Sequence, residues 1–280
     1  MEPLRELVDG AAAAVRRALP GPLPRWSIAS RFGADFLLAD GRRPPLHELA
    51  LPRGAGRLLA RVVPLAGEPL LALDVELRAP RDELPRAAAL QEALPLLIAG
   101  ALGLRGTLHL LAGVALAGTA RPPLLAPVRD WLRLSDEDPL RHFEPAALGA
   151  RYPDLRGAAS GREWATLAAV VARHGGAAPA IVATRRGPSG ATDAEFAAAG
   201  RLGADAVAEG CAAEWVAARH QGLAFLPIVL LLDAVAETPI ADPGLLAARA
   251  ATLLPRLAAL LPELFDALRA LPASDSELPR

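Results

Sequence analysis

Residues 203–223 read GADAVAEGCAAEWVAARHQGL, and this stretch decides how the second half of the chain folds. Gly203 is suited to end a preceding helix, because glycine readily adopts the left-handed conformation found at helix C-termini. The apolar residues 204–208 predict a short strand, and residues 211–220 predict a helix. Glu209 stands between them, at the end of an apolar run where a charge is uncommon. The stretch therefore predicts a strand–turn–helix unit with a carboxylate at the turn.

The sequence on either side continues the alternation of helix and strand. Thr192-Asp-Ala-Glu195 is a capping box, in which the threonine hydroxyl accepts a free N–H and the glutamate reaches back. This helix runs to about Leu202. Downstream, the apolar residues 223–232 predict a strand that terminates in Asp233. Strands that are apolar on both faces are typical of a sheet covered by helices on both sides.

The rest of the chain shows the same alternation. Helices are predicted at residues 3–19, 86–102 and 162–173. Strands are predicted at residues 25–30, 107–116 and 178–184, with a hairpin at 57–76. Residues 117–160, rich in Pro, Gly and Arg, predict long surface connections. Asp242-Pro243 predicts the start of a C-terminal helix that Pro255 and Pro262 should kink or break. We expect a single α/β domain over residues 1–280.

Composition excludes several classes of function. The chain has 280 residues and a net charge of -1, which gives no electrostatic case for nucleic acid or an anionic membrane. All 30 basic residues are arginine, and asparagine is absent, so no mechanism uses a lysine nucleophile or an asparagine amide. The single cysteine, Cys211, excludes an internal disulfide and a multi-cysteine metal site. We expect a cytoplasmic protein without a metal, since neither a targeting signal nor an uncharged run of about 20 residues is found.

Several motifs in a fixed order resemble the trimeric branch of the purine nucleoside phosphorylase family. The strongest are residues 187–195, 202–207, Glu214 and 217–223, and weaker ones are 55–58, 129–130, 138–141 and 151–154. The resemblance covers nearly the whole chain. It implies a three-layer α/β/α fold with a mixed, twisted sheet, a homotrimer, and a purine nucleoside or base as ligand. The implied reaction is cleavage of the purine–ribose N-glycosidic bond, with phosphate as co-substrate and no cofactor.

The residues that would bind phosphate depart from this family's pattern. A dianion needs N–H groups, hydroxyls and an arginine or histidine. The family's Gly-Ser-Gly loop is replaced by a loop in which Phe32 follows Arg31 and Asp35 adds a negative charge. Arg78 lies one place from the expected arginine, and Ala112 lies in the segment that replaces the family's Asn-Ala-Ala-Gly-Gly. The sequence thus predicts a degenerate phosphate site.

A phosphate site built from other residues is the alternative. Its candidates are Arg31, Arg53, Arg57 and Arg78. Arginine suits this purpose because its planar guanidinium donates two parallel hydrogen bonds to a phosphate.

The purine and ribose positions are altered as well. Ala191 stands where the family has a glutamate, Glu209-Gly210 replaces a Met-Ser pair, and Asp233 replaces an asparagine. Glu209 can accept hydrogen bonds from both ribose hydroxyls, and Asp233 can protonate a purine nitrogen to improve the leaving group. The resemblance thus implies Glu209 and Asp233 as catalytic candidates, and Gly210 and Ala191 as further substrate-binding positions.

Three functions remain open at this point. One is an altered phosphorylase, and another is a catalytically inactive binding or scaffold protein. The third is a phosphate-independent nucleosidase that uses Glu209 and Asp233, with Asp35 as the candidate that activates water. The structural alternatives are that Glu209 turns into solvent and that Asp233 caps the following turn.

Overall fold

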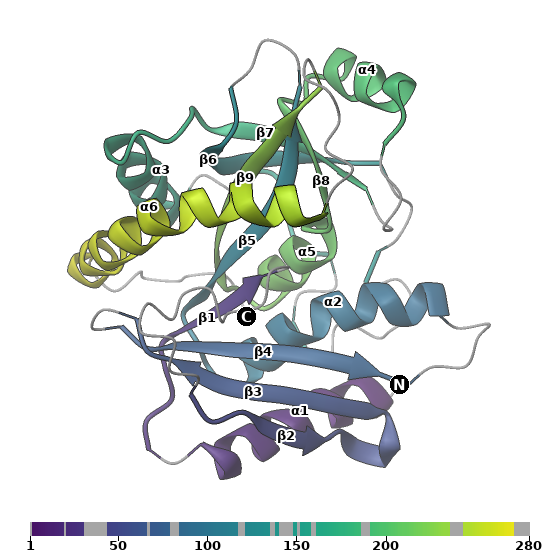
Figure 1. The fold of residues 1–280 in the computed structure, drawn as a ribbon. Helices are drawn as coiled ribbons and strands as arrows, with labels where there is room; N and C mark the ends of the chain where they lie inside the picture. The colour runs from purple at the N-terminus through teal and green to yellow at the C-terminus, as the bar shows by residue number, and fades with distance from the viewer. Residues whose placement is uncertain are drawn as a thin grey trace.

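The computed structural model describes residues 2–19, 21–30, 44–65, 68–78, 84–116, 121–134, 138–139, 148–149, 152–157, 161–185, 191–235 and 243–271. Figure 1 shows the arrangement. The helices are α1 (Glu2–Ala18), α2 (Leu84–Ala101), α3 (Arg162–Arg173), α4 (Asp193–Arg201), α5 (Ala212–His220) and α6 (Pro243–Ala270), with a 3-10 turn, η2, at Pro52–Gly54. The strands are β1 (Trp26–Ser30), β2 (His47–Ala50), β3 (Gly56–Val63), β4 (Leu70–Leu77), β5 (Gly106–Ala115), β6 (Leu124–Arg133), β7 (Ala180–Arg185), β8 (Ala206–Glu209) and β9 (Ala224–Ala234).

The described strands form one mixed sheet. Its order is β2-β3-β4-β1-β5-β8-β7-β6-β9, and β5 also pairs with β9. This second pairing closes the last five strands into a ring, while β2, β3 and β4 extend from it through β1, as the lower part of Figure 1 shows. The long strand β5 therefore belongs to both halves of the sheet, and its partners determine which side chains meet.

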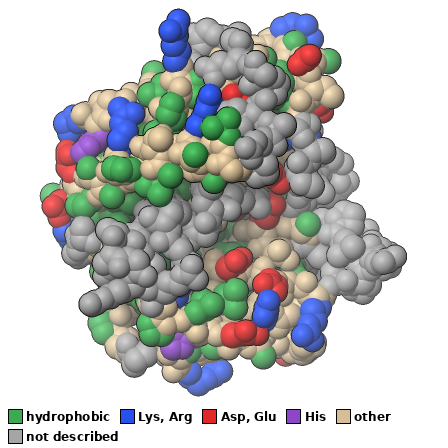
Figure 2. All heavy atoms as spheres, in the orientation of Figure 1, with side chains coloured by type: hydrophobic (Ala, Val, Ile, Leu, Met, Phe, Trp, Pro, Cys, Tyr) green, Lys and Arg blue, Asp and Glu red, His purple; other side chains and the backbone are tan. Residues whose placement is uncertain are grey.

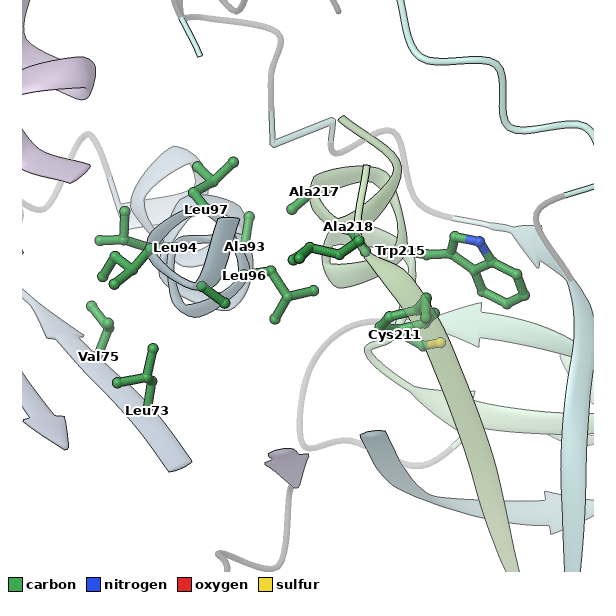
Figure 3. Packing of buried hydrophobic residues seen from close by; sticks show 14 of the residues in the cluster. Leu73, Val75, Ala93, Leu94, Leu96, Leu97, Cys211, Trp215, Ala217 and Ala218 are labelled. Atoms are coloured by element: carbon green, nitrogen blue, oxygen red, sulfur yellow. The ribbon is translucent and has the colours of Figure 1, made fainter. Parts of the chain in front are cut away.

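Apolar cores lie on both faces of the sheet. One core joins α1, α2 and α5 to the sheet, and the other joins α3 and α6 to it. Figure 3 shows the first of these, where α2 packs against β4 on one side and α5 on the other. The predicted α/β class with a mixed sheet between helices is thus confirmed.

Most predicted elements are confirmed, and the exceptions have physical causes. Residues 117–160 are not all surface connections, because β6 lies among them and pairs with both β7 and β9. Pro127 obscured this strand, since proline is rare inside a sheet. α6 continues through Pro255 and Pro262 without a break. The leucines of α6 that pack on the sheet, such as Leu257 and Leu260 at 0 % exposure, hold it in helical form.

α6 is also long and apolar enough to cross a membrane, judged by length and composition alone. A helix that packs on a protein core passes the same test. The apolar stripe of α6 packs with α3 and the sheet in the second core, which accounts for its composition.

An ion-pair cluster fastens α6 to the end of α3. Arg173 donates to one oxygen of Glu263 at 2.7 Å, and His174 Nε2 lies 2.8 Å from the other oxygen. The hydrogen bond with His174, followed by that from Arg173, lowers the pKa of the Glu263 carboxyl. A lowered folded-state pKa contributes stability above the ordinary value, and this contribution is lost as the pH falls through the folded-state value.

Replacing Glu263 by glutamine is therefore expected to lower the melting temperature slightly at pH 7. The difference from the parent protein should shrink as the pH falls below the ordinary glutamate range, because the parent carboxylate is then protonated as well. Melting curves between pH 3 and pH 7 measure it. A difference that stays constant over this range would contradict the assigned role of the carboxylate.

Candidate functional site

Two strands end head to head beside β5. Ser30, the last residue of β1, pairs with Leu110. β8 runs antiparallel to β5 on the same side, and Ala208 pairs with Gly113. Continuing this register places Glu209 beside Ala112, two residues from the end of β1. We call this place the strand junction, defined by Ser30, Glu209, Gly210 and Ala112.

The strand junction brings together residues that are far apart in the chain. Its members come from β1, β5 and β8 and the turn after β8. The carboxyl ends of strands are where α/β folds place their ligands, because the loops that follow surround an open crevice there. Sequence analysis named three of its members, Glu209, Gly210 and Ala112, and the structure places these three together.

Asp233 lies on the other side of β5, and a β-bulge redirects it. Gly113 pairs with Leu231, but the next residue, Val114, pairs with Asp233, so that β9 carries one extra residue. A bulge of this kind turns the following side chain and is common beside functional sites. Asp233 is 7 % exposed, and its Oδ1 accepts the N–H of Ala234 at 2.9 Å.

Arg249 of α6 holds the Asp233 side chain. Its Nη1 lies 3.6 Å from Asp233 Oδ1 and donates to the carbonyl of Leu232 at 2.8 Å. The arginine thus balances the charge of the carboxylate and fixes it against the bulged strand. Sequence analysis placed Asp233 at the end of this strand, and it is the last residue but one of β9.

Glu209 and Asp233 do not form a contacting pair. Both Val207 and Asp233 pair with Val114, so Glu209 lies two strand spacings and two residues away from Asp233. At about 4.8 Å per strand and 3.4 Å per residue, their Cα atoms are roughly 12 Å apart. Glu209 is exposed, which matches the structural alternative of a carboxylate that turns into solvent. The two carboxylates can act on one ligand only if that ligand extends across β5.

A carboxyl side chain already stands at the start of α5. The Glu214 carboxylate is buried, at 4 % residue exposure, and accepts the N–H of Cys211 at 3.0 Å. Cys211 itself has a φ of 85°, which is strained for a residue with a side chain. A helix N-terminus attracts anions through its free N–H groups, but here Glu214 occupies part of that position.

A cavity of about 510 Å³ opens at the end of β1. Its described lining comes from β1, β3, β4, α2, β5 and α5, and from Pro44 and Leu46 before β2. The polar side chains in it are Ser30, Arg61, Asp74, Gln91, Glu92, His109 and Glu214. Figure 2 shows acidic and arginine side chains close together on the face over β3 and β4. The volume lies within the range of roughly 300–1,000 Å³ that small-molecule sites occupy.

Among the described residues that line this cavity, acidic side chains outnumber basic ones. Among the described lining residues, Arg61 is the only arginine, whereas Asp74, Glu92 and Glu214 are acidic. His109 is buried at 1 % exposure, and its ring centroid lies 5.4 Å from that of Phe225. Within the described part of the chain, no group of three or more His, Cys, Asp and Glu side chains is arranged to hold a metal ion.

Of the arginines proposed for phosphate, the three that the structure describes, Arg53, Arg57 and Arg78, are not among the residues that line the cavity. Arg57 donates to both oxygens of Glu76, at 2.6 and 3.0 Å, and to Glu48 at 3.2 Å on the exposed side of the hairpin. Hydrogen bonds to Glu76 and then Glu48 raise the pKa of Arg57. Arg53 donates to Glu6 of α1 at 3.1 Å.

Of the remaining candidate residues, the structure describes Arg78 and Ala191. Arg78 is exposed, and its N–H donates to the carbonyl of Ala55 at 2.8 Å. Ala191 directly precedes the capping box of α4, which is confirmed by the hydrogen bond from Glu195 N to Thr192 Oγ1 at 3.3 Å. Arg31, Phe32 and Asp35 lie outside the described residues. Arg53 and Arg57 are thus paired with glutamates in this structure, and the phosphate site proposed from these arginines stays a prediction.

Sequence reasoning missed the residues that line the cavity. His109, Arg61 and Asp74 each lie in a predicted strand or hairpin and carry no motif of their own. One local signal was available, the alternation of side chains between the two faces of a strand. Arg61 follows Arg57 by four residues and so lies on the same face of β3 as Arg57. Glu214 was noted only as part of the resemblance.

The mixed sheet with its closed ring, the helices on both faces and the strand junction define a class: the chain has a nucleoside phosphorylase fold. The structure of purine nucleoside phosphorylase from Schistosoma mansoni in complex with inosine superposes with a TM-score of 0.75 and 17% identity, covering 96% of this chain and 97% of that chain. The complex of the same enzyme with adenosine gives 0.75 and 18%, covering 95% and 97%. A Schistosoma purine nucleoside phosphorylase with guanosine gives 0.74 and 17%, covering 96% and 98%.

Comparison by sequence alone adds nothing to this result. No protein-family model matches the sequence, and no curated protein matches it significantly. The expected purine nucleoside phosphorylase fold is thus confirmed by structure. Sequence identities this low are evidence for the fold and not for the reaction.

Proposed function

We propose that the protein binds a purine nucleoside at the strand junction and in the adjoining cavity, and that it does not carry out phosphorolysis. The similar structures contain inosine, adenosine or guanosine, which supports a nucleoside as the ligand class. The junction of β1 and β8 beside β5 provides an opening where strands end, and the cavity provides the volume.

The absence of phosphorolysis is proposed from the acidic side chains among the described residues that line the cavity. Phosphate at neutral pH is largely a dianion, and three carboxylates line the described part of the cavity against one arginine. Like charges in a partly buried site repel strongly, because solvent screens them little. One of the three, Glu214, stands at the α5 N-terminus, where free N–H groups would otherwise favour phosphate.

The test combines binding and turnover. Thermal shift and calorimetric titration with inosine, adenosine and guanosine should show binding, and inorganic phosphate should not strengthen it. Release of free base should not rise when phosphate is added. Base release that depends on phosphate would refute the proposal, and so would the absence of binding by all three nucleosides.

Hydrolysis is the second candidate, and it rests on the carboxylates at the same end of the sheet. Glu209 at the junction and Asp233 at the bulge flank β5, so a nucleoside lying across β5 reaches both. Release of base without phosphate, lost in Glu209→Gln and in Asp233→Asn, would support this reaction. If base is released and both variants retain the full rate, these two residues are not the catalytic groups.

The remaining expectations concern assembly and role. A homotrimer is proposed from the resemblance, and the molar mass measured by light scattering should be about three times that of one chain. If neither binding nor base release is found, the scaffold alternative is favoured, because the fold then persists without its chemistry.

A further inference from the structure

The cavity at the end of β1 has a lining whose charge suits one kind of ligand. We propose that it selects nucleosides that carry a protonated amine over neutral and phosphorylated nucleosides. This inference rests on the proposed function and adds to it the class of ligand.

Three acidic side chains reach the cavity from three separate elements. Asp74 comes from β4, Glu92 from α2 and Glu214 from α5. With Arg61 from β3 as the one arginine among the described lining residues, the formal charge of this lining is -2 when all three carboxyl groups are ionised and His109 is neutral. The acidic residues thus come from three separate elements and do not form one exposed patch.

Burial makes this charge effective. Glu214 is 4 % exposed and Glu92 is half-buried, so water screens their fields less than it would at an open surface. An ammonium group donates three hydrogen bonds and gains from each carboxylate it approaches. These gains offset the cost of removing the ammonium from water, whereas a phosphate group meets repulsion from the same carboxylates.

The neutral parts of the cavity fit the rest of such a ligand. Ile28, Leu59, Leu73 and Val75 supply apolar surface, and Ser30 and Gln91 supply hydrogen-bonding groups. A site with an apolar wall and a few polar groups is typical of small-molecule recognition. The charged groups then decide between ligands that share the same base and sugar.

The test uses derivatives of one nucleoside that differ in charge at either end of the ribose. The probes are adenosine, 5′-amino-5′-deoxyadenosine, 3′-amino-3′-deoxyadenosine, and adenosine 5′- and 3′-monophosphate. We expect at least one amine to bind about tenfold more tightly than adenosine, and both monophosphates to bind more weakly. The advantage of the amine should fall as salt is added, because ions screen the attraction.

The outcomes separate this inference from the proposed function. If adenosine binds and neither amine binds more tightly, the inference is wrong and the proposed function stands. If a monophosphate binds more tightly than adenosine, the inference is likewise wrong. If none of the probes binds, the proposed function fails, and the inference fails with it.

Two conservative variants test the assigned carboxylates. Asp74→Asn and Glu92→Gln each remove one charge from an exposed or half-buried side chain, so the fold should tolerate both. Each is expected to lower the ratio of amine affinity to adenosine affinity by about threefold or more. Asp193→Asn on the exposed start of α4 removes the same charge away from the cavity and should leave the ratio unchanged. An equal change in all three variants would assign the effect to net charge and overturn the role of the cavity.

Discussion

Replacing Trp215 by alanine is expected to destabilise the protein by about 3–5 kcal/mol, the cost typical of removing a buried tryptophan. Trp215 has 0 % exposure, and its ring centroid lies 3.8 Å from that of Trp131 and 5.3 Å from that of Phe225. The indole joins α5 to β6 and β9, so its loss leaves a cavity that the rigid strands around it cannot fill. Urea unfolding measured by circular dichroism gives the change in free energy.

Trp215→Phe is the matched control. Among the described residues, the buried indole N–H of Trp215 has no hydrogen-bond acceptor. Phenylalanine removes that donor and keeps an aromatic ring, so its cost should be well below that of alanine. The half-buried Trp131 should also cost less when replaced by alanine. If Trp215→Ala costs less than about 1 kcal/mol, the ring is not the packing centre assigned to it.

Trp215 also affects the candidate site, because it lies on the same helix turn as Glu214. α5 begins at a strained residue, Cys211, and the Glu214 side chain stabilises that start by accepting the N–H of Cys211. Packing of the indole against β6 and β9 therefore holds the carboxylate at the cavity. Loss of the indole should weaken nucleoside binding even under conditions in which the variant remains folded.

Local signals in the sequence predicted local structure well. The capping box of Thr192 and Glu195 depends on residues three apart, and it is formed as expected. Gly203 has a φ of 91°, so its role in ending α4 was also readable. Both features depend on backbone geometry within a few residues, which is the range that sequence reasoning covers.

The cavity could not be predicted in the same way. Its polar lining comes from six elements, and the pairing registers that bring them together are set by the whole sheet. Arg57 illustrates the difficulty, because its guanidinium is paired with Glu76, which lies directly opposite it across the hairpin. The partner depends on the hairpin register, which the sequence did not specify.

The strand junction could be predicted from the sequence only in part. Glu209 and Gly210 were identified from the resemblance, and the register of β5 and β8 places them where a ligand would be expected. Asp233 was identified in the same way, but its bulge and its arginine partner were not foreseen. Arg249 lies 16 residues further along, and sequence analysis had no reason to link the two.

Replacing Arg249 by methionine is expected to lower the free energy of unfolding by about 1–3 kcal/mol, which is the second large effect. The side chain of Asp233 is 10% exposed and that of Arg249 is 27% exposed, so the substitution leaves a largely buried carboxylate without its cation. The hydrogen bond from Arg249 to the carbonyl of Leu232 is lost as well. Urea unfolding of the single variant measures the cost.

Asp233→Asn supplies the partner for a double-mutant cycle. The amide oxygen can still accept the N–H of Ala234 but carries no charge, so the single variant should cost less than Arg249→Met. In the Arg249→Met background, Asp233→Asn should restore part of the lost stability, because no unpaired charge then remains. Costs that simply add would show that the two side chains are not coupled. Nucleoside affinity is then measured on the same four proteins. A purine contact at Asp233 changes affinity without a matching change in stability, whereas an ion pair that only holds the bulged strand to α6 does not.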